Sequence, residues 1–363
     1  MKLLRAYVLK EHVSPFLVTI SGLTAAMLIG HVIKFAELVI AKGVSLLDIL
    51  RLLLDLIPFL LSFTIPMACL IAMILAFGRL NADYELIAMR ASGIAPARLI
   101  LPFAVTALVL SGSLLILNDY VVPSAHLAFR RQLKAIGVKR PTAYIEPGMF
   151  IKEFSPYVIF VYQIEGKTML HVRIYEPKPD GATRTIMASR GEFEPVSDGN
   201  SVQLKLFRGT VDEWDPEHPG SLYKVSFGTY SMQLTASDES ESRINKKLKE
   251  MTFRELLQQR DQLLTQHIRT LPIDLEIHRR IAASFAPVVF MLFGLMLGLG
   301  PQHHERLLTF VWVLLMFLAY YLSSLAMSAL ALKEILPPWL AMWIPNAVGG
   351  TLSLLGVARA ARR

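Results

Sequence analysis

The chain has 363 residues and a formal net charge of +8, which would allow two domains and a nucleic-acid-binding surface. Hydrophobic residues make up 53% of it and charged residues only 18%, against about 25% in soluble domains. This composition excludes an ordinary soluble domain. Most of the basic residues flank apolar stretches, so membrane topology accounts for the charge and no nucleic-acid partner is expected. The single cysteine, Cys69, excludes a disulfide framework.

Six apolar stretches lack any Asp, Glu, Lys or Arg. An α-helix needs about 20 apolar residues to cross the hydrocarbon core of a bilayer, and each stretch has about that length or more. Buried helices of soluble proteins are seldom so long and so free of charge. The sequence therefore predicts an integral membrane protein with six spans. The six stretches are Val13–Ile33, Leu56–Gly78, Leu99–Asn118, Ile281–Gly300, Leu307–Leu332 and Ile335–Ala358.

The distribution of Lys and Arg predicts on which side of the membrane each loop lies. With the N-terminus in the cytoplasm, the short cytoplasmic segments contain ten basic residues and the short external loops contain four. Cytoplasmic loops normally carry this excess, so both termini are expected in the cytoplasm. The cytoplasmic residues are Lys2, Arg5, Lys10, Arg79, Arg90, Arg98, Arg306, Arg359, Arg362 and Arg363, and the external ones are Lys34, Lys42, Arg51 and Lys333.

A large external segment is expected between the third and fourth spans. Stretches such as YVIFVYQIEG and SVQLKLFRGTVDEW are β-branched and aromatic, and turn residues such as SDGN separate them. This spacing predicts an antiparallel sandwich or open roll. Thr252 and Glu255 have capping-box spacing, so a helix should follow the strands. Three parts are expected: residues 1–122 with spans one to three, residues 123–272 with the β domain and its following helix, and residues 273–363 with spans four to six.

The loop between the second and third spans, NADYELIAMRASGIAPAR, is more elaborate than a connection requires. Asn81 is suited to an N-cap, Asp83 and Glu85 lie where the helix dipole favours anions, and Gly93 suits the position after a helix. The implied helix, residues 82–92 within the segment 81–93, would be about 16 Å long, too short to cross a bilayer. It is either a surface offered to a partner or an amphipathic helix on the headgroups.

Five basic residues lie at the external ends of the first and third spans, where topology does not require positive charge. Arg130 and Lys134 are four residues apart and share one helical face. Such a cluster is suited to the phosphate groups of an anionic lipid. The alternative is that each side chain extends from a helix end to the membrane surface. The five residues are Lys34, Lys42, Arg130, Arg131 and Lys134.

Motifs for nucleotide binding and hydrolysis are missing from the sequence. It contains neither the G-x-x-x-x-G-K-[ST] phosphate loop nor the G-x-S-x-G nucleophile turn. The stretch QHHER has two histidines and a glutamate, but adjacent histidines point to different helix faces. We therefore expect no metal site and no cofactor in this chain, so energy from ATP and Mg²⁺ would have to come from another subunit.

Three features together resemble the lipopolysaccharide-export permeases LptF and LptG (YjgP/YjgQ-type) of Gram-negative bacteria. They are FGRLNADYELIAMRASGI after the second span, the large β domain after the third, and EIHRRIAASFAPVVFMLFGLMLGL at the fourth. The resemblance implies an α-helical membrane protein with six transmembrane helices (3+3) and a periplasmic, jelly-roll-like all-β domain inserted between helices 3 and 4. Lys34 and the AKG around Lys42 favour the G-type permease, whereas EIHRRIAASFAP favours the F-type.

The resemblance also implies partners and roles. In that family two six-helix permeases pair in the inner membrane, and each offers its first cytoplasmic loop to an ATPase dimer, LptB, which binds ATP and Mg²⁺. The pair takes lipopolysaccharide from the outer leaflet and passes it to a periplasmic bridge of β folds (LptA/LptC-like). The five basic residues would hold its phosphates and core sugars. The coupling positions implied are Asp83, Tyr84, Glu85, Met89, Arg90 and Gly93, with Glu85 matching the acidic residue that contacts the ATPase.

Two other classes of function are considered. A membrane enzyme acting on lipid-linked sugars would need carboxylates that converge in a pocket, for which Glu146, Glu153, Asp212 and Glu213 are available without a recognised spacing. A lipoprotein-release permease usually has four spans with its large domain after the first. That layout differs from the one predicted here.

Overall fold

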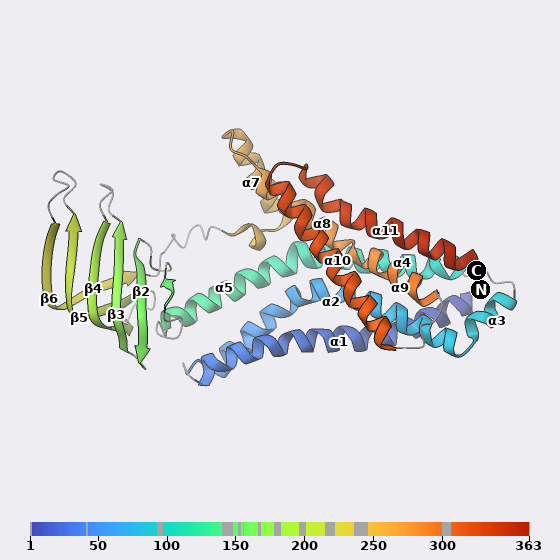
Figure 1. The fold of residues 1–363 in the computed structure, drawn as a ribbon, viewed down its shortest axis with the longest axis horizontal. Coiled ribbons are helices and arrows are strands. Elements are labelled where there is room, and N and C mark those ends of the chain that lie inside the picture. The colour runs from blue at the N-terminus through green and yellow to red at the C-terminus, as the bar shows by residue number, and fades with distance from the viewer. Residues whose placement is uncertain are drawn as a thin grey trace. The chain divides into compact units, whose positions relative to one another are not determined.

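The computed structural model describes most of the chain and divides it into two compact units. The helical unit comprises Met1–His31, Leu53–Ala128 and Lys246–Arg363, and the sheet unit comprises Val32–Leu52 and Phe129–Asn245 (Figure 1). The described residues are 2–40, 43–92, 97–139, 148–151, 154, 156–165, 168–177, 183–195, 201–214, 222–235, 246–299 and 306–362.

Six helical stretches among the described residues are long and apolar enough to cross a membrane, which confirms the predicted number of spans. The third stretch runs on beyond the expected span, because a π-helical turn joins two α-helices instead of ending the first. The N-terminal helices are α1 (Lys2–Ile40), α2 (Leu46–Ala82), α3 (Glu85–Ala91), α4 (Ala97–Ile116), η1 (Leu117–Val121) and α5 (Val122–Lys139).

The fourth stretch consists of two helices that meet at Phe285. Pro287, the second residue of α9, has no N–H to donate and its ring clashes with the carbonyl four residues earlier, so it favours a break at this point. Pro58, Pro66 and Pro345 lie inside continuous helices instead. The C-terminal helices are η2 (Leu248–Glu250), α7 (Phe253–Thr265), α8 (Leu271–Ser284), α9 (Ala286–Leu299), α10 (Arg306–Leu332) and α11 (Pro338–Arg362).

Two glycines on α9 allow close packing against α2. A Cβ atom added at Gly294 would lie 2.5 Å from the Met73 Cβ atom, and one added at Gly298 would lie 2.5 Å from the Phe77 Cβ atom. Both distances are shorter than any ordinary contact between such atoms. The Gly-x-x-x-Gly spacing therefore brings the two helix backbones together, as small residues commonly do in membranes.

The inserted domain is a single antiparallel sheet whose strands follow chain order from β1 to β6. The sequence predicted either a sandwich or an open roll. The described strands form one sheet, which confirms the open roll, because a sandwich consists of two sheets. The up-and-down order also differs from the Greek-key order of a true jelly roll. The strands are β1 (Phe150–Ile151), β2 (Val158–Glu165), β3 (Thr168–Pro177), β4 (Thr183–Pro195), β5 (Ser201–Trp214) and β6 (Leu222–Thr235).

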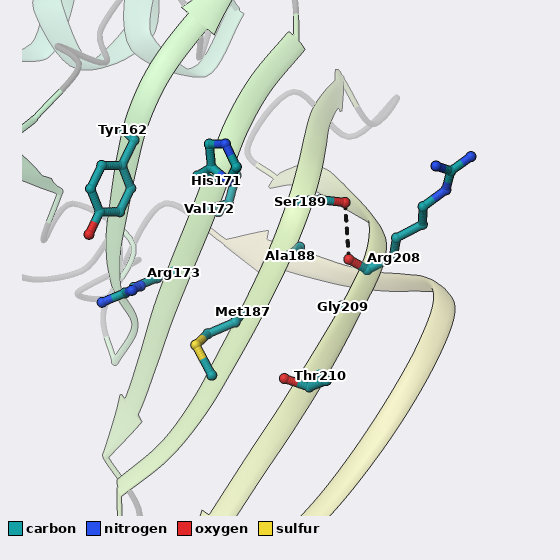
Figure 2. A pocket seen from close by; sticks show the side chains of 10 residues that line it. All are labelled: Tyr162, His171, Val172, Arg173, Met187, Ala188, Ser189, Arg208, Gly209 and Thr210. Atoms are coloured by element: carbon teal, nitrogen blue, oxygen red, sulfur yellow. Dashed lines mark hydrogen bonds between the residues drawn. The ribbon is translucent and has the colours of Figure 1, made fainter.

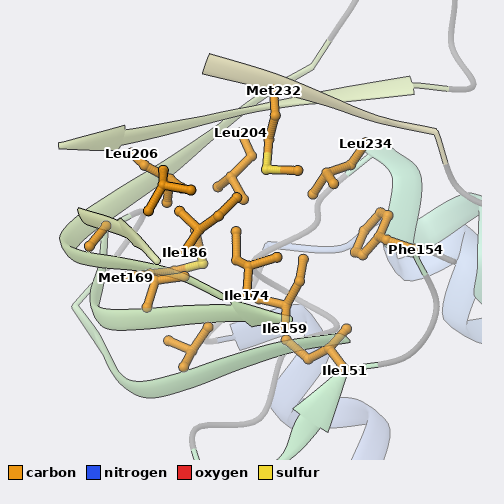
Figure 3. Packing of buried hydrophobic residues seen from close by; sticks show 14 residues of the cluster. Ile151, Phe154, Ile159, Met169, Ile174, Ile186, Leu204, Leu206, Met232 and Leu234 are labelled. Carbon is orange, nitrogen blue, oxygen red and sulfur yellow. The ribbon is translucent and has the colours of Figure 1, made fainter. Parts of the chain in front are cut away.

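The sheet curves around its own hydrophobic core, to which β2–β6 all contribute (Figure 3). Ile159, Ile174, Ile186 and Leu204 are completely buried although the described strands form one sheet. Curvature replaces the second layer that a flat sheet would need to bury its apolar face.

Along a line that crosses the strands, the regular alternation of inward-facing and outward-facing side chains is interrupted. Met169 and Val172 both face the core although they are three residues apart, and Leu206 and Val211 do so five residues apart. His171 and Arg208, on this line, have positive φ angles of 53° and 51°. Beside Arg208, a Cβ on Gly209 would lie 2.1 Å from the Met187 carbonyl oxygen. The line is the bend by which the sheet closes on its core.

Candidate functional site

The short helix α3 begins later than the sequence predicted. Asn81 lies in the last turn of α2, not at an N-cap, because α2 continues to Ala82. Tyr84 then turns the chain with a φ angle of 58°, and α3 runs from Glu85 to Ala91. Leu80 is buried and Arg79 pairs with Asp83 over 3.6 Å, so tertiary packing and an i,i+4 ion pair extend α2 past the predicted start. The corner before α3 was not visible in the sequence.

Polar contacts hold α3 and the end of α2 against the first helix. The Tyr7 hydroxyl donates a 3.0 Å hydrogen bond to Glu85 Oε1, and the Arg79 guanidinium donates a 2.7 Å hydrogen bond to Glu11. On the inner side of α3, Leu86 is buried and Met89 packs against the same apolar cluster. Tyr7 and Glu11 could not be predicted from a local pattern, because both are more than 60 residues away from their partners.

The outer side of α3 presents apolar surface. Tyr84, in the corner before α3, is 71% exposed, Ile87 in α3 is 55% exposed, and Asp83 beside them is exposed. Figure 1 shows α3 at the same end of the helical unit as the start of α1 and the end of α11. The side chain of Arg90 and all of Gly93 lie outside the described residues. The arrangement offers an exposed aromatic and aliphatic pair on a segment continuous with α2.

The predicted basic cluster lies on two helices of the sheet unit. Lys34, near the end of α1, is exposed, and on α5 Arg131 is exposed and Arg130 half-buried. The rings of Phe35 and Phe129, each next to one of these residues, have centroids 6.4 Å apart, so the two helices are neighbours here. Lys42 and the Lys134 side chain lie outside the described residues.

A buried arginine holds the segment 248–253, called the connector below, through which the chain leads from the strands to α7 and α8. Arg280, on α8, is buried and pairs with the buried Glu276 over 2.8 Å. Its two terminal nitrogens donate to the Met251 carbonyl over 2.6 Å and to the Leu248 carbonyl over 2.7 Å. All three nitrogens of the guanidinium therefore have hydrogen-bond acceptors, as a buried arginine requires.

The helix after the connector begins with the predicted capping box. The Thr252 hydroxyl accepts from the Glu255 backbone N–H over 3.3 Å, and Glu255 accepts from the Thr252 N–H over 2.9 Å. Burial opposes ionisation of the Glu255 carboxyl, but hydrogen bonds from Lys246 and Thr252 outweigh it, so the pKa of Glu255 is lowered from its ordinary value. The box keeps a charged carboxylate at the first turn of α7.

A polar residue pair in the π-helical turn η1 also reaches this connector. Asn118 is buried, and its amide contacts Ser62 on α2 and Ser284 on α8. The next residue, Asp119, accepts a 2.6 Å hydrogen bond from the backbone N–H of Phe253, the first residue of α7. Neither Asn118 nor Asp119 was among the residues predicted to have a role. The one feature of the sequence that could have indicated them is their position as two consecutive polar residues at the end of an apolar stretch.

A hollow of about 560 Å³ lies on the outward face of the sheet, at the bend (Figure 2). Arg173 lies over the Tyr162 ring, 5.5 Å from its centroid. The carboxylates considered for an enzyme do not line it: Asp212 pairs with Lys224 over 4.0 Å and Glu213 lies 3.8 Å from Arg184. The other two, Glu146 and Glu153, lie outside the described residues, as does most of QHHER. Within the described part of the chain, no three His, Cys, Asp or Glu side chains are grouped so as to hold a metal ion.

Comparisons with known proteins agree with the architecture of spans and sheet. The sequence pattern of the family described as "Lipopolysaccharide export system permease LptF/LptG" matches residues 6–359. An uncharacterized protein, RP871, of Rickettsia prowazekii (strain Madrid E) is 23% identical over 286 residues, which cover 77% of each chain. The family match covers essentially the whole chain, including the six spans and the sheet between the third and fourth. The protein therefore belongs to the LptF/LptG family of lipopolysaccharide export permeases.

Proposed function

We propose that this permease is one subunit of an ATP-driven transporter that extracts lipopolysaccharide from the outer leaflet of the inner membrane and passes it to a periplasmic bridge of β folds. The observation that carries the proposal is the exposed apolar pair Tyr84 and Ile87 on the short helix α3 and the corner before it, two residues after the end of a membrane-crossing helix. Both termini and α3 lie in the cytoplasm, and the sheet lies in the periplasm. The chain itself catalyses no reaction.

The energy source in this proposal is a separate ATPase dimer that binds ATP and Mg²⁺. Its surface receives Tyr84 and Ile87, while Glu85 supplies a carboxylate to a basic or hydrogen-bonding group of the ATPase. Because α2 continues almost to α3, movement of the ATPase surface displaces the end of a helix that is half buried in the bundle. The packing of α2 against Gly294 and Gly298 then carries the displacement into α9.

A second six-helix permease completes the membrane part of the transporter. Two helices support this step, because α1 and α10 bury the least of their apolar stretches inside this chain, 0% and 6% respectively. The corresponding fractions for α2 and for α8 with α9 are 50% and 56%. The apolar faces of α1 and α10 therefore remain available to the lipid cavity and to the partner permease.

Lys34 and its basic neighbours hold the phosphate groups of the lipid. Reversing the charge with Lys34→Asp should weaken photocrosslinking of lipopolysaccharide at this end of α1 by about tenfold, because an attraction to phosphate becomes a repulsion. Lys10→Asp is the matched control, an exposed lysine near the opposite end of the same helix. Equal crosslinking in the two variants would contradict the role of Lys34.

Purification from the native membrane tests the proposed assembly. A tagged chain should co-purify with an ATPase subunit and with a second six-helix permease in fixed proportions. Recovery of the folded chain with neither protein, under conditions that preserve other membrane complexes, would overturn the proposal.

A further inference from the structure

The π-helical turn η1 interrupts the third membrane helix at Leu117–Val121. Such turns insert one extra residue into an α-helix, are rare, and occur frequently at functional sites. Two consecutive polar side chains of this turn, Asn118 and Asp119, bind different neighbours: Asn118 bonds to side chains on α2 and α8, and Asp119 bonds to the backbone at the start of α7.

Asn118 ties together three helices inside the bundle. Its Oδ1 atom accepts a 2.8 Å hydrogen bond from the Ser62 hydroxyl on α2, and its Nδ2 atom donates a 3.0 Å hydrogen bond to the Ser284 hydroxyl on α8. Ser284 donates in turn to the Arg280 carbonyl over 2.8 Å. Because Asn118 and Ser284 are buried, water cannot replace a partner that moves away.

Asp119 and Arg280 both hold the connector by hydrogen bonds to its backbone. Asp119 accepts from the Phe253 N–H, and Arg280 donates to the carbonyls of Leu248 and Met251. Residues 248–253 are therefore fixed by one carboxylate from η1 and one guanidinium from α8. The connector is the segment through which the chain returns from the strands to α8.

We propose that Asn118 and Asp119 form a joint that transmits movement of α2 to the connector, residues 248–253. This inference rests on the proposed function only in that ATPase-driven movement enters through α3 and α2. A shift of α2 along its axis pulls on the Ser62–Asn118 bond, and the adjacent Asp119 shifts the first residue of α7. The joint residues are positioning residues, and they contact neither lipid nor nucleotide in this role.

Hydrogen exchange in the intact, purified protein tests the joint without reference to transport. Ser62→Ala and Asn118→Leu should each speed exchange of amides around Phe253 by about fivefold or more, although Ser62 is on a different helix. Ser113→Ala is the control, since that exposed hydroxyl donates to the Val109 carbonyl within its own helix. Exchange in α11 and in the sheet should stay unchanged. Unchanged exchange around Phe253, or equal acceleration throughout the chain, would overturn the joint.

A second measurement separates coupling from folding. In proteoliposomes containing the complete complex, Ser62→Ala should retain most ATP hydrolysis while lipid released per ATP falls about fivefold. Equal losses of hydrolysis and release would overturn the joint. If the unmodified complex hydrolyses ATP without ATP-dependent release, the proposed function fails. The exchange measurement still decides the joint in that case.

Discussion

Glu85→Lys should abolish ATP-driven lipid release while leaving the protein inserted in the membrane. In the proposed assembly the carboxylate meets a basic or hydrogen-bonding group on the ATPase, and a lysine at that position places like charges together. Such juxtaposition costs several kcal/mol at an interface, so we expect release to fall by about 100-fold or more. Release into an acceptor, measured beside ATP hydrolysis in proteoliposomes, gives the result.

Tyr7→Phe is the matched control for this substitution. It removes the hydroxyl that donates to Glu85 but leaves the carboxylate in place. Tyr7 is exposed, so water replaces the lost partner and release should change by about twofold or less. Release by Glu85→Lys at the unmodified rate, in a complex of normal composition, would contradict the coupling role of α3.

Gly294→Ala should destabilise the helical unit although it adds a single methyl group. The new carbon would lie 2.5 Å from Met73 Cβ and 2.8 Å from the Leu70 carbonyl oxygen. Neither atom belongs to the flexible end of a side chain, so α2 and α9 must separate. Overpacking of this kind costs about 1–3 kcal/mol. Thermal unfolding in detergent should show a lower melting temperature than that of the unmodified chain.

Gly350→Ala is the control, because nothing lies within 4 Å of a Cβ built there. It should leave the melting temperature unchanged or slightly raised, since alanine favours a helix by up to about 1 kcal/mol over glycine. Adding Met73→Ala to Gly294→Ala should not restore stability, because the Met73 Cβ remains. Equal melting temperatures for the two single glycine variants would contradict the close packing of α2 and α9.

Local patterns predicted the elements better than their ends. Charge-free stretches located all six membrane helices, and Thr252 with Glu255 located the start of α7. The start of α3 was wrong because Asn81 satisfies the composition of an N-cap, yet the burial of Leu80 keeps α2 helical past it. Local propensity is a weak prior where tertiary packing competes with it.

The joint at η1 depends on pairs that no local pattern contains. Ser62 lies 56 residues before Asn118, and Ser284 lies 166 residues after it. A π-helical turn has no composition of its own, so its position was not predictable either. One signal was available and unused: Gly294 and Gly298 have the Gly-x-x-x-Gly spacing inside an apolar stretch, which predicts close helix packing.

The stretch EIHRRIAASFAP, which supported the family resemblance, has a physical role in the structure. Glu276, Arg280 and Ser284 recur every four residues, so they lie on one face of α8, and each takes part in holding the connector or the η1 turn. This face ends at Ser284, where α8 ends, and Pro287 is the second residue of the next helix, α9, a position that tolerates proline. Residues of this stretch therefore hold the connector in place by hydrogen bonds.

The most direct test is ATP-dependent release of lipopolysaccharide from proteoliposomes that contain this chain, its partner permease and the ATPase. We expect release to a soluble β-fold acceptor to require hydrolysable ATP and an intact Glu85, and to stop with Glu85→Lys. Release at the same rate without ATP, or with Glu85→Lys in a fully assembled complex, would contradict the proposal that the ATPase drives this permease through its contact with α3.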